Sequence, residues 1–382
     1  MFFFKTQRDD VPQVTQSEPP ALQVGFDAAT LLDMPPYSLA RVDKEALFTD
    51  AMNALTRHHV AHCDDYRRML AFTGYSPAEN YALDALAPLP VRLFKDLELL
   101  SCTRNDVVKT LTSSGTTGQR VSRIFLDRTN ASLQTRVLAR ILASVSGGLR
   151  LPMLIVDSPA VVRDRRLFSA RGAGVLGFAM LGTDVTYALD ERMRLDESAI
   201  AAFCERHAHQ PALVFGFTSI VWEHLYMAMR ERGKRLPLHD AVLLHGGGWK
   251  KLADQAVDAV TFDNSLRETC GIGRSINYYG MVEQTGSIFI ACNHGHLHCS
   301  NYSDVIVRRH DFTPAATGES GTLQLMSLLP TSYPGHNLLS EDEAVVLGED
   351  DCPCGRKGKY FHVAGRIRQA ELRGCSDTYQ AA

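Results

Sequence analysis

The feature that most constrains the fold is a succession of four short apolar runs separated by stretches of helical length. The runs cover residues 152–157, 211–216, 241–244 and 275–279. A continuous apolar run of this length is typical of a strand that is buried on both faces of a parallel sheet. Residues 129–146 have the periodicity of an amphipathic helix, which Thr129 or Asn130 could cap, and we expect further helices at 196–207 and 251–264. The sequence therefore predicts an α/β fold with an open, mostly parallel sheet that helices cover on both faces.

The pattern changes near residue 300, where short strands alternate with turns. We expect strands near 305–307, 321–326 and 344–347, which predict a small β-rich subdomain. The first 35 residues are polar and rich in proline, so we expect a loosely ordered leader there. The predicted division is a leader over 1–35, an α/β core over 36–300, a β-rich subdomain over 301–364, and a hinge and tail over 365–382.

Composition argues against several classes of protein. The formal net charge of −3 gives no basic character that would favour nucleic acid. No apolar run approaches the ~20 residues of a membrane span, and the apolar start at residues 1–5 is too short for a signal peptide. Nine cysteines in a chain of 382 residues do not indicate a disulfide scaffold. We therefore expect a cytoplasmic protein with no nucleic-acid partner and no membrane span.

A loop at residues 112–119 contains only glycine, serine, threonine and glutamine. Such a loop can present backbone N–H and hydroxyl groups to an anion, and its two glycines let the backbone approach a ligand closely. A flexible linker has a similar composition, but the apolar runs at 107–111 and 121–126 indicate a loop between two strands. The residues expected to bind phosphate are Thr112, Ser113, Ser114, Gly115, Thr116, Thr117 and Gly118.

Two further segments follow predicted strands, and ligands of doubly wound sheets collect at the carboxyl ends of the strands. The three glycines at 246–248 have no side chains, so a flat base could lie against their backbone. Residues 278–284 offer an aromatic face and one carboxylate, Glu283, which could hold Mg²⁺ on the phosphates. Taken singly, three such glycines more often form a turn, such a tyrosine is more often a core residue, and such a glutamate is more often exposed to solvent.

Together, in this order, these segments resemble the adenylate-forming (acyl-activating) enzyme superfamily. Residues 112–118 resemble its phosphate loop, Gly246, Gly247 and Gly248 its adenine loop, and Tyr279, Gly280 and Glu283 its Tyr-Gly-x-x-Glu motif. The resemblance implies that the chain binds ATP with Mg²⁺ and activates a carboxylic acid.

Three further sets of residues are assigned only by this resemblance. Asp342 stands where the superfamily has its ribose-binding aspartate. Arg366, which follows Gly365, resembles the arginine that opens the hinge to the C-terminal domain, and it would contact the ribose or a phosphate. The acyl pocket would be lined by Phe215, Gly216 and His245.

Within the superfamily, the sequence is most similar to acyl-protein synthetases (LuxE-type, long-chain-fatty-acid–protein ligases). Residues 90–95 precede the phosphate loop as they do in that group, and Cys375 stands where the group carries its acylated thiol. The sequence ends soon after Arg366, so we expect the C-terminal lid domain of coenzyme-A ligases to be absent or vestigial. The resemblance implies an acyl-accepting protein partner, either a fatty-acid reductase or a carrier.

The chemistry of Cys375 agrees with a role as nucleophile. A thiolate attacks an acyl-adenylate readily because AMP is a good leaving group, and the thioester keeps the acyl group reactive. Neighbouring Arg373 would favour the thiolate, whereas Asp377 would oppose it. Three alternatives stay open: an incidental thiol in a frayed terminus, a ligase that loads coenzyme A or a carrier-protein thiol, and a nucleotide-binding scaffold without catalysis.

A separate group of residues has the character of a metal site. Four cysteines and three histidines fall in two short segments, 292–299 and 352–354, and could hold a tetrahedral zinc ion. Some relatives of the phenylacetate–coenzyme A ligases carry a similar set. By that resemblance, the ligands of a structural zinc would be Cys292, His298, Cys352 and Cys354. Unrelated core and loop residues are the alternative.

Overall fold

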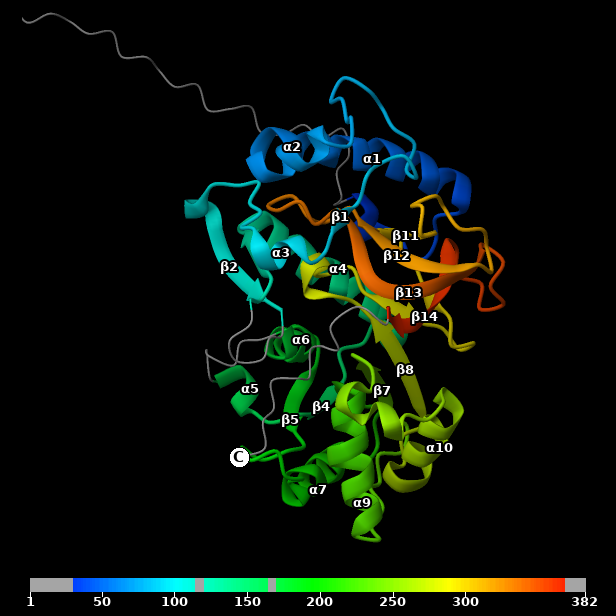
Figure 1. The fold of residues 1–382 in the computed structure, drawn as a ribbon. Helices are drawn as coiled ribbons and strands as arrows, with labels where there is room; N and C mark the ends of the chain where they lie inside the picture. Colours follow the sequence, from blue (N-terminus) through cyan, green and yellow to red (C-terminus); the bar gives the residue numbers. More distant parts are fainter. Residues whose placement is uncertain (1–29, 114–119, 164–169, 368–382) are drawn as a thin grey trace, which may run out of the picture.

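The computed structural model describes residues 30–113, 120–163 and 170–367, and it shows a mixed α/β fold around one large sheet (Figure 1). The α-helices are α1 (Arg41–His62), α2 (Asp64–Ala71), α3 (Leu93–Asp96), α4 (Arg128–Ser146), α5 (Ala160–Arg163), α6 (Ala170–Ala179), α7 (Glu197–Arg206), α8 (Thr218–Ile220), α9 (Ala228–Glu231) and α10 (Ala259–Cys270). The 3₁₀ segments are η1 (Thr30–Asp33), η2 (Arg104–Asp106), η5 (Lys250–Gln255) and η6 (Val282–Gln284), and η4 (Val221–Met227) is a π-helix.

The strands cover most of the predicted apolar runs. They are β1 (Leu89–Pro90), β2 (Val107–Thr112), β3 (Arg123–Asp127), β4 (Pro152–Val156), β5 (Thr183–Tyr187), β6 (Leu213–Phe217), β7 (Val242–Gly246), β8 (Arg274–Tyr279), β9 (Phe289–Ala291), β10 (Leu297–His298), β11 (Ser303–Arg308), β12 (Ser320–Ser327), β13 (Asn337–Glu349) and β14 (Lys359–Arg366).

Among the described residues, 12 of these strands form one sheet, and β2 and β3 form a separate hairpin. The strands β5, β4, β6, β7 and β8 are parallel neighbours, as expected for the predicted core. Antiparallel pairing then continues the same sheet through β9, β10, β14, β13, β12 and β11. Figure 1 shows the parallel part in the lower half and β11–β14 beneath α1 and α2 in the upper half. The division of the chain at residues 300 and 364 stays a prediction, since the sheet itself runs on without a break.

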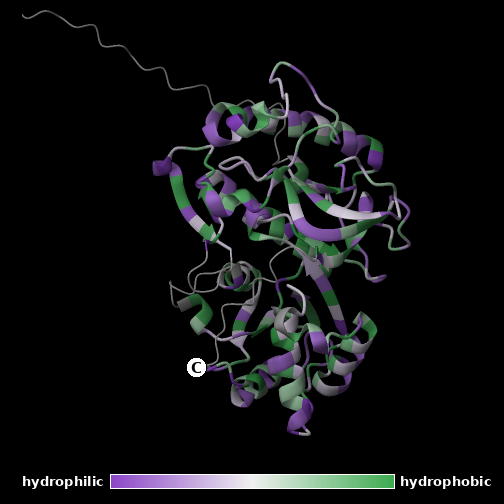
Figure 2. Cartoon of the chain, viewed as in Figure 1, coloured by the Kyte–Doolittle hydropathy of each residue, from purple (hydrophilic) through white to green (hydrophobic). Residues whose placement is uncertain are grey.

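Helices cover both faces of the parallel strands. Phe215 of β6 pairs in register with Leu244 of β7, so these two residues share one face, and the ring of Phe178 of α6 stacks on Phe215 with 4.1 Å between centroids. His245 of β7 is on the other face, where the ring of Phe262 of α10 lies 4.6 Å away. β4 and β6 are buried along their whole length, whereas Figure 2 shows hydrophilic residues at the outer end of α9. The prediction of a sheet covered on both faces is therefore confirmed.

Two local predictions were wrong. The residue that caps α4 is Asp127, whose carboxylate accepts a hydrogen bond from the N–H of Asn130 at 2.7 Å, and not Thr129 or Asn130. The stretch 251–264, expected as one helix, holds the short η5 and then α10, which begins after its own cap, Asp258. Carboxylates that accept backbone N–H groups decide where both helices start. None of the described helices is long and apolar enough to cross a lipid bilayer.

A cluster of buried histidines fastens α1 to the loop between β12 and β13. Nε2 of His59 lies 3.2 Å from the carbonyl oxygen of Pro330, and the rings of His59 and His336 stack at 4.7 Å. Nε2 of His336 lies 3.0 Å from the hydroxyl of Thr56. Burial lowers the pKa of His59 well below its usual value and lowers the pKa of His336 to about 3. Both rings are therefore neutral in the folded protein at neutral pH.

This cluster predicts that the protein loses stability as the pH falls. Because the folded-state pKa values lie below the ordinary value near 6.5, only the unfolded chain gains protons between pH 7.5 and 5.5. Each ring should cost about 1.4 kcal/mol over this interval. Urea unfolding of His336→Gln should show a loss that is smaller by about 1 kcal/mol, with His62→Gln at the exposed end of α1 as the control. An unchanged pH dependence in His336→Gln would contradict the assignment.

Candidate active site

The base of the predicted phosphate loop is closed by two serines between β2 and β3. The N–H of Ser113 donates to the carbonyl oxygen of Ser122 at 3.0 Å, and the N–H of Ser122 donates to the hydroxyl of Ser113 at 2.8 Å. The antiparallel register of β2 and β3 pairs Thr112 with Arg123. The predicted loop between two strands is therefore confirmed at its ends. Ser114, Gly115, Thr116, Thr117 and Gly118 lie outside the described residues.

Glu283 lies buried beside this base, with only 8% of its surface exposed. Burial raises the pKa of its carboxyl group, and the side chain of Ser122 together with the positive charges of Lys95 and Arg366 opposes this rise. Ser122 directly precedes β3, Lys95 is in α3 and Arg366 is in β14. Loss of hydration makes a carboxylate costly in such a place, so a cation bound there would be strongly favoured.

Tyr279, Asp342 and Arg366 meet at the end of β8. The hydroxyl of Tyr279 donates to Oδ2 of Asp342 at 2.6 Å, and Asp342 pairs with Arg366 in the register of β13 and β14. Nε of Arg366 lies 4.0 Å from Oδ1 of Asp342, and Nη1 lies 3.8 Å from a carboxylate oxygen of Glu341. Burial and the charge of Asp342 raise the pKa of Tyr279 well above 10, so its hydroxyl keeps its proton. Residues 63 positions apart, Tyr279 and Asp342, thus form one polar constellation.

The three glycines at the end of β7 occupy positions where side chains do not fit. A Cβ on Gly246 would lie 2.6 Å from the carbonyl oxygen of Tyr278, and a Cβ on Gly247 would lie 2.9 Å from the ring of Phe217. Gly247 and Gly248 have φ of 84° and 66°, in the left-handed region that favours glycine. Tyr278 of β8 and Phe217 of β6 fill the space beside Gly246 and Gly247, whereas no atom of the described residues lies within 4 Å of a Cβ built on Gly248. Of the three glycines, Gly248 therefore leaves the backbone open to close approach by a flat ligand.

The predicted acyl-pocket residues do not line one surface. Phe215 is fully buried under α6, whereas Gly216 and His245, which pair in register, are on the opposite face of the sheet. Gly216 is packed against Val221, because a Cβ there would lie 2.6 Å from that side chain. Strand alternation sends successive side chains to opposite faces. Phe215 and His245 therefore cannot share a pocket, and this part of the prediction is corrected.

His245 instead belongs to a small polar site at the carboxyl end of β6. Its Nδ1 lies 3.0 Å from the hydroxyl of Thr218, which also donates to the carbonyl oxygen of Gly246 at 3.1 Å. Burial lowers the pKa of His245 to about 4, so the ring is neutral. Thr218 was not predicted from the sequence, although it follows β6 directly and ligands of such sheets collect at strand ends. Ser122 and Lys95 were not predicted either, because only the tertiary fold brings them close to Glu283.

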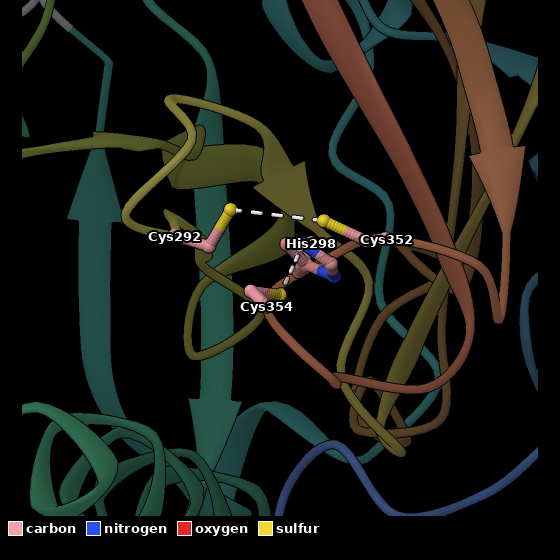
Figure 3. Close-up of side chains that lie close together, drawn as sticks. All are labelled: Cys292, His298, Cys352 and Cys354. Atoms are coloured by element: carbon pink, nitrogen blue, oxygen red, sulfur yellow. Dashed lines mark hydrogen bonds between the residues drawn. The ribbon is translucent and has the colours of Figure 1, made fainter.

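The four cysteine and histidine residues expected to bind zinc come together. Their ligand atoms lie within 4.8 Å of one another, as Figure 3 shows for Cys292, His298, Cys352 and Cys354. Cys292 follows β9 and His298 is in β10, while the two others are in the turn between β13 and β14. The cluster therefore joins one hairpin to another, 60 residues further along the chain.

The spacing of these atoms fits a tetrahedral ion. Two zinc–sulfur bonds of 2.3 Å separate their sulfurs by about 3.8 Å, and one sulfur and one nitrogen by slightly less. Sγ of Cys292 lies 3.9 Å from Sγ of Cys352, and Sγ of Cys354 lies 3.4 Å from Nε2 of His298. Nδ1 of His296 lies 3.5 Å from Sγ of Cys352, so this histidine is a neighbour of the cluster. The three-sulfur, one-nitrogen set is chemically suited to zinc.

Cys375, the predicted nucleophile, lies outside the described residues. The described structure ends at residue 367, next to the constellation that contains Arg366. The N–H of Ile367 donates to the carbonyl oxygen of Glu341 at 3.0 Å, which holds the start of the tail against β13. Cys375 follows only eight residues after this anchored point.

Comparison with known proteins agrees with this geometry. The family model described as "Acyl-protein synthetase, LuxE" matches residues 25–382. The long-chain-fatty-acid–luciferin-component ligase of Vibrio harveyi is 24% identical, with 89% of each chain covered. The corresponding ligase of Aliivibrio fischeri is 22% identical, with 78% of each chain covered.

Among solved structures, an open conformation of 2-hydroxyisobutyryl-CoA ligase superposes with a TM-score of 0.67 at 16% identity. The match covers 88% of this chain and 78% of that one, and at this identity it shows a shared fold. That fold is the adenylate-forming one predicted from the sequence motifs, and the family model spans nearly the whole chain. The chain therefore belongs to the acyl-protein synthetase (LuxE) family.

Proposed function

We propose that this protein is an ATP-dependent ligase that activates a long-chain fatty acid as acyl-AMP and transfers the acyl group to Cys375. The observation that carries the proposal is the convergence of Tyr279, Asp342 and Arg366 at 2.6–4.0 Å, beside the closed base of the 112–119 loop. The named activity of the two bacterial relatives, ligation of long-chain fatty acids, supports the choice of substrate class.

In the first step, a carboxylate oxygen of the acid attacks the α-phosphorus of ATP, and the bond to the β-phosphate breaks to release pyrophosphate. The loop at 112–119 would hold the phosphates through its N–H and hydroxyl groups. Asp342, oriented by the hydroxyl of Tyr279, would accept hydrogen bonds from the ribose, and Arg366 would balance charge on the α-phosphate. The loop of Gly246, Gly247 and Gly248 would receive the adenine at the open side of Gly248.

Glu283 is the residue that would hold Mg²⁺. When bound, that ion neutralises charge on the phosphates and orients them for displacement. The buried carboxylate, flanked by Ser122 and Lys95, offers oxygen ligands of the kind that Mg²⁺ prefers.

In the second step, the thiolate of Cys375 attacks the acyl carbonyl carbon of acyl-AMP, the bond to the phosphate oxygen breaks, and AMP leaves. The thioester then delivers the acyl group to a partner protein, which we propose to be a fatty-acid reductase. The anchoring of Ile367 beside Arg366 supports this role, since the eight following residues could span on the order of 25 Å to the acyl-adenylate.

We further propose that Cys292, His298, Cys352 and Cys354 hold a structural zinc ion. The ion would fasten the hairpin of β9 and β10 to the turn between β13 and β14, and its role would be to stabilise the fold. The separations of 3.9 Å and 3.4 Å between ligand atoms support the proposal.

Replacement of Glu283 should separate activity from stability. Glu283→Gln keeps the shape but removes the charge, so fatty-acid-dependent ATP–pyrophosphate exchange should fall by at least ~100-fold. The free energy of unfolding at pH 8 should not fall, because burial raises the pKa of this carboxyl group and its ionised form is costly in the folded state. Glu319→Gln, which breaks a surface pair with Arg309, serves as the control. Full exchange activity in Glu283→Gln would contradict the assignment.

Replacement of Cys375 should separate the two steps. Cys375→Ser should retain most of the ATP–pyrophosphate exchange but lose labelling of the protein by radioactive fatty acid that neutral hydroxylamine removes. Cys102→Ser should keep both, since burial raises the pKa of that thiol to about 11 and leaves it protonated. Thioester labelling that persists in Cys375→Ser would contradict the role of this residue. Mass spectrometry with a panel of acids would identify the acyl group, and release of acyl-coenzyme A would favour the alternative ligase.

The zinc proposal predicts one zinc ion per chain in protein purified without chelators, measured by inductively coupled plasma mass spectrometry. Cys354→Ser should lower this content at least threefold and lower the Tm by several degrees, whereas Cys204→Ser, at a buried cysteine outside the cluster, should keep the zinc. If the Tm of zinc-free wild-type protein did not rise when zinc is added, this result would contradict the proposal.

A further inference from the structure

A cavity of about 520 Å³ lies on the side of β13 that faces away from the active-site constellation. Leu339 of β13 contributes to its floor, whereas Ser340, the next residue, faces Tyr279. Leu70 at the end of α2 and Leu93 of α3 form further parts of its lining, which is predominantly apolar. The cavity shares no residue with the site proposed for ATP and the acid, so its function requires a separate explanation.

Two phenylalanines at the cavity are unusually exposed for aromatic side chains. Phe72 is 93% exposed and Phe312 is 62% exposed, and both line the cavity. Phe312 also has φ of 65°, a left-handed conformation that costs a bulky residue free energy. An exposed aromatic residue held in a strained backbone conformation next to an apolar cavity is characteristic of a binding surface.

A buried arginine holds this surface in place. Arg308 is only 4% exposed, and its guanidinium donates to the carbonyl oxygen of Phe312 at 2.9 Å and to that of Asp84 at 2.7 Å. Its Nε donates to the side chain of Gln324 at 2.6 Å. One side chain therefore ties together two segments that both line the cavity, so the cavity is a built feature of the fold.

We propose that the cavity binds the N-terminal segment of the same chain, Met1 to Lys5. This segment contains Phe2, Phe3 and Phe4, the only run of three aromatic residues in the sequence. Aromatic side chains match the apolar lining. Lys5 follows directly, and Asp84, an exposed residue that lines the cavity, carries the opposite charge.

The length of the chain fits this occupant. The hydroxyl of Tyr302 donates to the carbonyl oxygen of Leu31 at 3.0 Å, which places the first described residues at the start of β11. The six residues of β11 then run about 20 Å to Arg308 at the cavity. Residues 5–29 supply 25 residues between Phe4 and Thr30, and a linker of this length spans about 28 Å on average. A linker that matches its span gives a high effective concentration.

The test uses the full-length chain and a fluorescein-labelled peptide of residues 1–10. In the variant Phe2→Ser, Phe3→Ser, Phe4→Ser, the cavity should be free, and the peptide should bind with a Kd of tens of μM by fluorescence polarisation. Binding to the wild-type chain should be at least tenfold weaker, because the tethered segment competes. Adding Phe312→Gly to the triple variant should weaken binding tenfold, and glycine adopts this φ without strain, so the fold should persist. Adding Leu149→Ser, at an apolar residue exposed elsewhere, should change nothing.

Three results would overturn the proposal. Equal binding of the peptide to the wild-type chain and the triple variant would show that the segment does not occupy the cavity. Displacement of the peptide by tetradecanoate would identify an acyl-chain site. Sedimentation of the wild-type chain as a dimer, and of the triple variant as a monomer, would show that the segment binds a second copy. The proposal does not rest on the ligase activity, because no step of the test measures it.

Discussion

The shared register of the parallel strands is the constraint on which the candidate active site depends. Because β4, β6, β7 and β8 run in the same direction, their carboxyl ends lie along one edge of the sheet. The glycines after β7 and the tyrosine at the end of β8 are neighbours for this reason alone. The strands can be short and apolar because α6 and α10 bury their two faces, which leaves the edge for polar chemistry.

The hairpin of β13 and β14 completes that edge from the other part of the sheet. Near one end it pairs Asp342 with Arg366, and the turn at its other end carries Cys352 and Cys354. The bond from Tyr279 to Asp342 links the parallel strands to this antiparallel hairpin. The residues that we propose to bind the nucleotide thus come from two regions of different architecture, which one continuous sheet joins across the predicted boundary near residue 300.

The sequence was sufficient to predict the parallel strands, the loop between β2 and β3, and the gathering of the cysteine and histidine cluster. Each of these depends on a local pattern or on a motif of fixed order. Whether Phe215 and His245 share a face depends on the register between strands, which no local pattern encodes. The neighbours of Glu283 also escaped prediction, because Ser122 and Lys95 approach it only through the tertiary fold. The prediction of one helix over 251–264 was wrong because helical periodicity alone does not locate a cap such as Asp258.

The turn between β13 and β14 bears on how the protein could lose its site while it stays folded. A β-ladder can slip by one residue, and such a slip turns every side chain of a strand to the opposite face. The pairing of β13 with β14 already shifts register between residues 343 and 344 and between residues 346 and 348, so regular pairing near the turn does not by itself fix the register at Asp342. The zinc ion that we propose at the turn would fix the register of the whole hairpin. Without this ion, the chain could keep its secondary structure and its compactness while Asp342 faces away from Tyr279. It would then be a folded protein that lacks the proposed nucleotide site.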